Sequence, residues 1–147
     1  MLFQNHQEQL KLEIVTYEFP PDGGEPDNGD DRNWLVLRGT YTDEDGQVVK
    51  DSNSCLLTYE LREMAAGLKV LCAGIKDHYD SSFVEPYFEL SAQADGEDRF
   101  LADVSFYLPN VMDGEDTAQV EAALTRAEMT ALIEELDGFC ERFPDRS

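Results

Sequence analysis

Residues 55–75, with the sequence CLLTYELREMAAGLKVLCAGI, decide the fold, because they read as a buried strand that turns directly into a helix. Residues 55–57 are consecutively apolar, which is typical of a strand buried on both faces. Thr58 marks the change, since its hydroxyl can accept a hydrogen bond from a free amide of the first helical turn. Apolar residues then recur at intervals of three and four along one helix face: Leu61, Met64, Ala65, Leu68, Leu71, Cys72 and Ile75. Such a face requires a sheet to cover.

The segments on either side of this stretch predict the strands of that sheet. Residues 10–19 alternate between apolar and polar with a change of phase near Val15, which indicates a bulge, and residues 1–9 are expected to form a loosely ordered lead-in. Further strands are predicted at 33–42, at 47–57 with an interruption at 51–54, at 82–92 and at 99–108. Pro86 lacks an amide proton, so the strand at 82–92 is expected at an edge or with a bulge. Residues 118–124 read as a short strand or a loop.

A second helix is predicted after Thr125, because Thr125 and Glu128 have the capping-box spacing of a helix N-terminus. Its apolar side consists of Met129, Leu132, Ile133, Leu136, Phe139, Cys140 and Phe143. Acidic turns at 43–46 and 95–98 join neighbouring strands as hairpins. We therefore predict one α+β domain over residues 1–147. It has a mainly antiparallel β-sheet of about five or six strands, two helices packed on one face, and the order β-β-β-α-β-β-(β)-α.

The chain is strongly acidic. Its 11 Lys and Arg residues are outnumbered by 32 Asp and Glu residues, which gives a formal net charge of −21 and an isoelectric point near 4.1. Nucleic acids and anionic membranes are bound through Lys and Arg, so neither is the expected partner. A cationic protein is expected instead. The same composition also fits a salt-adapted acidic proteome, and the sequence leaves these two explanations open.

Two acidic segments and one strand supply the candidate partner-binding residues. The loop at 20–32 is rich in Pro and Gly; the alternative interpretation of this loop is a solvated insertion without a binding role. Glu85 and Glu89 share a face of the strand predicted at 82–92 with Phe83 and Tyr87. They are either solvated or part of an acidic and aromatic surface that receives Lys or Arg. The full set is Asp22, Glu25, Asp27, Asp30, Asp31, Asp43, Glu44, Asp45, Glu85 and Glu89.

No sequence pattern predicts a catalytic residue, a metal site or a cofactor. The chain lacks the G-x-S-x-G, P-loop and G-x-G-x-x-G motifs, and neither acidic loop has EF-hand spacing. His6 and His78 are isolated from each other in the sequence. The three cysteines have no C-x-x-C spacing and are expected to be free thiols in a reducing compartment. A different class remains open, namely a small hydrolase or metal-dependent enzyme that uses Glu85, Glu89 or Asp103.

The sequence also bears on where the protein acts. No apolar run approaches the ~18 residues of a membrane span. Residues 1–9 lack the basic and apolar regions of a signal peptide. A cytoplasmic protein is therefore expected, with its oligomeric state left open. A structural or regulatory subunit is a third class that the sequence allows.

Four short motifs carry a family resemblance: NWL at 33–35, CLLTYEL at 55–61, EPYFEL at 85–90 and RFPDR at 142–146. In their order and spacing, roughly residues 10–147 resemble the WapI-type bacterial immunity proteins. These small proteins protect a producing cell from the C-terminal domain of a polymorphic toxin. The loops at 20–32 and 110–117 depart from the family as longer acidic inserts. The resemblance implies a non-enzymatic protein that binds a toxin domain, and the charge predicts that this domain is cationic, as a nuclease would be.

Overall fold

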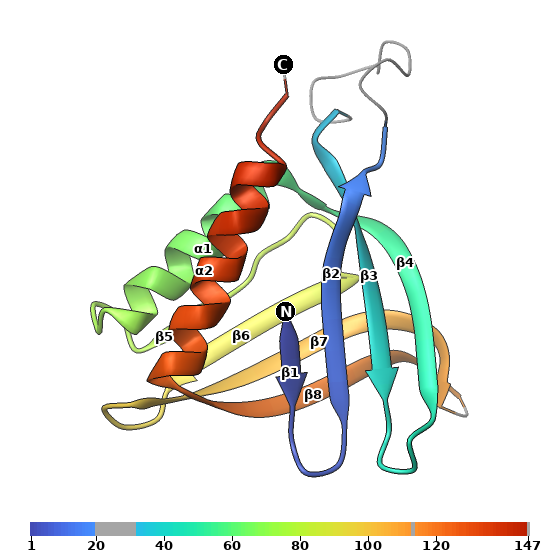
Figure 1. Cartoon of the computed structure of the whole chain (residues 1–147), viewed down its shortest axis with the longest axis horizontal. Coiled ribbons are helices and arrows are strands. Elements are labelled where there is room, and N and C mark those ends of the chain that lie inside the picture. Colours follow the sequence, from blue (N-terminus) through green and yellow to red (C-terminus); the bar gives the residue numbers. More distant parts are fainter. Residues whose placement is uncertain (20–31, 113, 147) are drawn as a thin grey trace.

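The computed structural model describes residues 1–19, 32–112 and 114–146 (Figure 1). Within them the chain forms eight strands and two helices in the order β4-α-β4-α. The elements are β1 Leu2–Gln4, β2 Gln9–Tyr17, β3 Trp34–Thr42, β4 Val48–Leu57, α1 Thr58–Cys72, β5 His78–Asp80, β6 Phe88–Ala94, β7 Arg99–Met112, β8 Glu115–Thr125 and α2 Arg126–Arg142. The predicted α+β class and the antiparallel pairing of the strands are confirmed.

The strands form two four-stranded antiparallel sheets rather than one sheet of five or six strands. The first has the order β1-β2-β3-β4 and the second the order β5-β6-β7-β8. Strands of the first sheet run across those of the second (Figure 1). Alternation in a sequence reports which strand face is buried, and it carries no information about which sheet covers that face. The division of the strands into two sheets could therefore not be predicted from the sequence.

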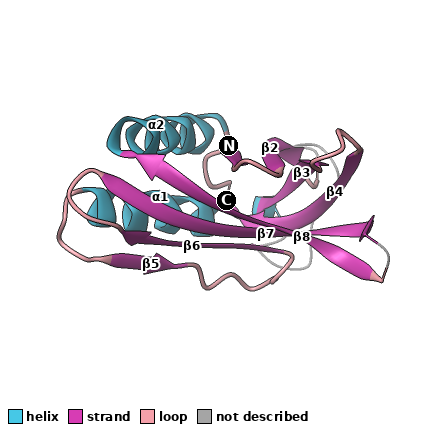
Figure 2. Cartoon of the chain, turned by 90° about the horizontal axis from the view of Figure 1, so that it is seen from below, coloured by secondary structure: helices cyan, strands magenta, loops and turns pink. Residues whose placement is uncertain are grey.

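One face of the second sheet is covered by the first sheet and by both helices, which lie side by side (Figures 1 and 2). Between Arg99 and Leu108, only one side-chain parity of β7 is buried. It consists of Phe100, Ala102, Val104, Phe106 and Leu108, the first four of which were predicted to share a face. All the covering elements therefore pack on this parity. The first sheet approaches so closely that a Cβ on Gly39 of β3 would lie 2.5 Å from Cδ1 of Phe106.

Helix α1 buries most of its predicted face, namely Leu61, Met64, Ala65, Leu68 and Leu71. Its ends differ from the prediction. The N-cap is Leu57, whose amide donates to Oε1 of Glu60 at 3.0 Å. The Thr58 hydroxyl instead donates to the carboxylate of Asp145. The helix ends at Cys72, and Gly74 follows with φ of 77°, so Ile75 lies outside the helix and is 75% exposed.

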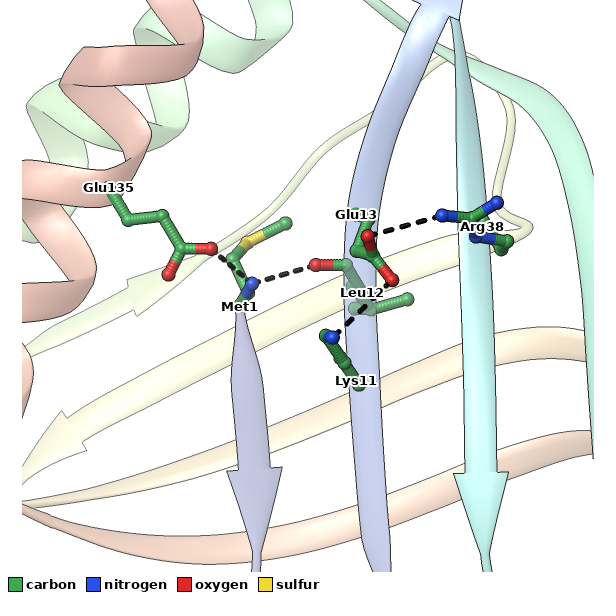
Figure 3. A network of polar contacts seen from close by, with 6 residues as sticks. All are labelled: Met1, Lys11, Leu12, Glu13, Arg38 and Glu135. Atoms are coloured by element: carbon green, nitrogen blue, oxygen red, sulfur yellow. Dashed lines mark hydrogen bonds and ion pairs between the residues drawn. The ribbon is translucent and has the colours of Figure 1, made fainter. Parts of the chain in front are cut away.

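The N-terminal residues are more ordered than predicted. Residues 1–9 were expected to be loose, yet β1 pairs with β2, and Met1 and Phe3 are buried. The Met1 ammonium donates to the carbonyl of Leu12 at 2.7 Å and contacts the carboxylate of Glu135 on α2 (Figure 3). A strand of three residues is too short for alternation to show, so this pairing depends on the apolar contacts of Phe3 in the finished fold.

Several strand boundaries also differ from the prediction. The strand predicted at 82–92 begins only at Phe88, because Pro86 supplies no amide proton, and residues 82–87 form a loop. Strand β4 continues through 51–54, and β7 continues past Pro109. Strand β5 had not been predicted. The bulge near Val15 is confirmed by a register shift between Ile14 and Thr16.

Helix α2 confirms its predicted start. The amide of Glu128 donates to the Thr125 hydroxyl at 3.1 Å, and the amide of Thr125 donates to Oε1 of Glu128 at 3.0 Å. Neither helix in the described part of the chain is long and apolar enough to cross a membrane.

Candidate partner-binding surface

The outer face of the second sheet is open, because the first sheet and the helices cover the inner one. Antiparallel register aligns Asp80 of β5, Ser91 of β6, Asp103 of β7 and Glu121 of β8 in one row across the sheet. Glu89 of β6 lies one row further along, beside Ser105 and Gln119. We call this outer face, with the carboxylates of Asp80, Glu89, Asp103 and Glu121, the acidic sheet face.

The carboxylates of the acidic sheet face form no ion pair with any Lys or Arg of the described residues. Gln119 donates from Nε2 to both carboxylate oxygens of Asp103, at 3.0 and 3.2 Å. Nε2 of His78 lies 3.9 Å from Oδ2 of Asp80. Because like charges gather there without a Lys or Arg partner among the described residues, this face projects negative potential into solvent.

The outer face of the first sheet is different in charge. It carries Lys11 of β2, Arg38 of β3 and Lys50 of β4, which the strand register places on the same face. Glu13 lies 3.2 Å from Nη2 of Arg38 and 3.7 Å from Nζ of Lys11 (Figure 3). Burial raises the pKa of Glu13, but the hydrogen bond from Arg38 and the charge of Lys11 outweigh it and hold that pKa below its ordinary value. Negative charge on this sheet is thus locally neutralised.

The acidic sheet face is hollowed along its length. One hollow of about 530 Å³ is lined by Glu89, Asp103, Ser105 and Gln119, among others. A second, of about 1030 Å³, runs from Asp80 and Asp103 to Leu101 and to the β1–β2 turn at 5–6. Asn5 fastens that turn beside β8, because its Nδ2 donates to the carbonyl of Glu121 at 2.9 Å. The two hollows share Asp80, Ser91 and Asp103, so they adjoin each other at this row of residues.

An aromatic pair lies at one end of this face. The rings of Tyr87 and Tyr107 stack with centroids 5.1 Å apart and an interplanar angle of 27°. The amide of Tyr107 on β7 donates to the carbonyl of Tyr87, directly before β6, at 2.8 Å, which holds the two rings next to each other. Tyr87 is 43% exposed, so part of its ring surface is open to a partner.

The predicted residues Glu85 and Glu89 are separated by the structure. Glu89 lies exposed on the acidic sheet face, as predicted for an outward-facing strand residue. Glu85 is half-buried in the loop before β6, so the prediction that both share one strand face is wrong. This loop is held by α1, since the amide of Val84 donates to Oε2 of Glu60 at 2.7 Å.

The predicted turn at 43–45 joins β3 and β4 in the first sheet. Asp43 has a structural role, because its Oδ1 accepts from the amides of Asp45 and Gln47, both at 2.9 Å. Glu44 and Asp45 are exposed. The other predicted partner-binding residues, Asp22, Glu25, Asp27, Asp30 and Asp31, lie outside the described residues.

Sequence reasoning missed Asp80 and Glu121. Asp80 lies in a three-residue strand that has no periodicity of its own, and Glu121 lies in a segment that read as strand or loop. Asp103 was noticed within its strand but not included among the partner-binding residues. The register of four strands, which only the tertiary structure shows, brings these three side chains into one row.

The described residues offer little to a catalytic alternative. No three of their His, Cys, Asp and Glu side chains are grouped so that they could hold a metal ion. All three cysteines are free; they were expected to be buried as well, but only Cys55 is, and Cys72 and Cys140 are half-buried. Burial, and then the nearby Glu60 and Glu85, raise the pKa of the Cys55 thiol to about 12. That thiol is therefore protonated near neutral pH and is a poor nucleophile.

A model of the WapI-like immunity protein family matches residues 1–144. The chain belongs to this family. The resemblance seen in the four sequence motifs is thereby confirmed over nearly the whole chain. Membership of the WapI-like immunity family implies toxin neutralisation through binding of a cognate toxin, and such proteins are typically non-enzymatic.

Solved structures show that this WapI-like protein has a Whirly-like fold. The crystal structure of WHY3 from Arabidopsis thaliana matches with a TM-score of 0.52 and 14% identity, over 97% of this chain and 86% of that one. WHY1 from Arabidopsis thaliana has a TM-score of 0.47 and 15% identity, over 97% and 88% of the two chains. The structure of the plant transcriptional regulator PBF-2 has a TM-score of 0.49 and 16% identity, over 96% of this chain and 78% of that one. At 14% identity, the match to WHY3 shows a shared fold alone. No curated protein matches the chain.

Proposed function

We propose that this WapI-like immunity protein neutralises its toxin by covering a cationic surface of the toxin domain, without catalysing a reaction. The observation that supports this proposal is the acidic sheet face, whose carboxylates have no Lys or Arg partner among the described residues. A nuclease toxin must hold phosphates with Lys and Arg. Carboxylates on a rigid sheet can bind the same Lys and Arg side chains of the toxin and exclude the nucleic acid.

The overall charge supports the same proposal through kinetics. A net charge of −21 attracts a cationic protein over long distances and speeds encounter toward ~10⁸ M⁻¹s⁻¹ at low salt. Fast capture is useful when free toxin is lethal. The acidic loop at 22–31 and the turn at 43–45 remain part of the proposed surface, in the role of steering the toxin toward the protein.

Co-expression with the toxin domain encoded beside this gene tests the proposal. In the test variant, D80N, E89Q, D103N and E121Q neutralise the acidic sheet face. A control with the same change in charge carries E63Q, E97Q, E134Q and E141Q, which alter exposed side chains elsewhere. We expect the control to rescue growth and the test variant to fail, with a dissociation constant raised at least about tenfold, because several charge pairs are lost.

Two outcomes would contradict the proposal. If both variants rescue growth equally well, the acidic sheet face is not the neutralising surface. If the affinity for the toxin does not change with ionic strength, the acidic composition reflects salt adaptation and not partner binding.

A further inference from the structure

The acidic sheet face changes character along its length. Tyr87, which is 43% exposed, lies in the loop directly before β6, and Glu89 follows it two residues later within β6. Along β7, Tyr107 is followed in the reverse direction by Ser105 and then by Asp103. Residues two apart on a strand lie about 7 Å apart, so Glu89 lies one row from the tyrosine pair, within the reach of one long side chain, and Asp103 lies one row further, at about 13 Å.

The hollow beside this tyrosine pair is polar. Its volume is about 530 Å³, and its lining includes Glu89, Asp103 and the hydroxyls of Ser105 and Thr117. The amide of Gln119 bonds both oxygens of Asp103 and holds this carboxylate in one orientation. The Glu89 carboxylate has no hydrogen bond or ion pair with another described residue. The hollow therefore offers carboxylate acceptors, and none of the described residues that line it is Lys, Arg or His.

We propose that this end of the acidic sheet face is a subsite for an arginine side chain of the toxin domain. A guanidinium is planar, so it can stack on a tyrosine ring while it donates in parallel to a carboxylate. A lysine ammonium is a compact point charge that satisfies the carboxylate but gains less from the ring. Tyr87 and Tyr107 supply the aromatic platform, Glu89 supplies the acceptor in the next row, and Asp103 adds negative charge one row further along. This inference rests on the proposed function and specifies which chemistry of the toxin is recognised.

Peptides of six arginines or six lysines test the subsite on the isolated protein. They carry equal charge, so the overall negative potential attracts both alike. We expect wild-type protein to bind the arginine peptide about two- to fivefold more tightly than the lysine peptide at low salt, which is the size of a cation–π contact at an exposed site. Titration calorimetry measures both affinities, and amide chemical shifts should change most along β6, β7 and β8.

Tyrosine variants separate stacking from charge. In Y87L/Y107L, and to a lesser degree in Y87L alone, the preference for arginine should disappear, because arginine-peptide binding should weaken more than lysine-peptide binding. The Y87F/Y107F variant keeps both rings and should keep the preference. Equal binding of the two peptides to wild type, or shifts confined to the first sheet, would overturn the subsite.

Growth rescue distinguishes failure of this inference from failure of the proposed function. If the D80N/E89Q/D103N/E121Q variant fails to protect while Y87L/Y107L protects with unchanged toxin affinity, charge neutralisation stands and the arginine subsite is wrong. If the charge-neutralised variant protects fully, the proposed function itself is wrong.

Discussion

Glu60 is a buried carboxylate that joins three parts of the fold. It is 2% exposed, and its two oxygens accept hydrogen bonds from the amides of Leu57 and Val84. Its position in the first turn of α1 also places it near the positive end of the helix dipole. The carboxylate thus closes the strand-to-helix junction and fastens the loop that precedes β6.

The E60Q variant tests this role. Glutamine has one side-chain oxygen, so one of the two amides would face an NH₂ group and lose its acceptor. We expect the free energy of unfolding to fall by about 1–3 kcal/mol, the cost of an unsatisfied buried group. Urea unfolding measures the change, and E63Q is the control, because Glu63 is exposed on the same helix. An unchanged urea midpoint in E60Q would show that the carboxylate is dispensable.

Alanine substitutions at two glycines should have opposite effects on stability. A Cβ on Gly39 would lie 2.5 Å from the Phe106 ring, whereas a Cβ on Gly138 in α2 has no neighbouring atom within 4 Å. We expect G39A to destabilise the protein by about 1–3 kcal/mol through overpacking. G138A should stabilise it by about 0.5–1 kcal/mol through helix propensity. Thermal unfolding of both variants measures the difference, and G39A/F106L should recover part of the loss.

At the scale of elements, the segment at 143–146 fastens the helices to the first sheet. The Arg146 guanidinium lies 3.7 Å from the Tyr17 ring centroid and donates to the carbonyls of Phe19 and Arg32, each at 2.9 Å. Its amide donates to Oδ1 of Asn33 at 2.7 Å. These contacts join the end of β2 to the start of β3 and explain why a short motif at 142–146 accompanies the fold.

Replacing this arginine should loosen that end of the molecule. We expect R146A to lower the free energy of unfolding by about 1–3 kcal/mol, because it removes charged hydrogen bonds and a cation–π contact together. R146K should recover only part of the loss, since an ammonium cannot stack and donate in the same geometry. Chemical denaturation compares the three proteins; equal midpoints for R146A and wild type would contradict the assignment.

Asp145 in the same segment predicts a pH dependence. The hydrogen bond from Thr58, followed by that from Arg62, holds the pKa of Asp145 below its ordinary value. A carboxylate with a lowered folded pKa stabilises the protein above its unfolded pKa of about 3.9, and this stabilisation is lost as pH falls through the folded value. The difference in unfolding free energy between wild type and D145N should therefore shrink between about pH 6 and about pH 3. A constant difference would contradict the linkage.

At the scale of the whole molecule, the negative charge should destabilise the fold and strengthen binding of a cationic toxin domain. A net charge of −21 repels itself, so the urea midpoint should rise as NaCl increases from about 10 mM to about 500 mM. Affinity for a cationic toxin domain should fall over the same range. Both are measured in the same buffers. Stability that is independent of salt would show that the charges are too far apart to matter for folding.

The sequence by itself determined the α+β class, the two amphipathic helices, the alternating faces of β7, the capping box at Thr125 and the family. These features are local, because periods of two and of three to four residues record which side chains are buried, whatever covers them. It also indicated through alternation that Glu89 faces outward. It misplaced Glu85, because Pro86 delays the start of the strand to Phe88, and it overlooked β1 and β5, which are too short to show a period.

Only the tertiary structure decided that the strands divide into two sheets and that carboxylates from four strands of the second sheet gather on one open face. Asp80 and Glu121 are 41 positions apart by their own numbering, and no local pattern relates them. The antiparallel register of β5 to β8 places them in one row. Strand register is set by long-range packing of the inner face against the first sheet and the helices, and this packing is what makes the outer face a surface.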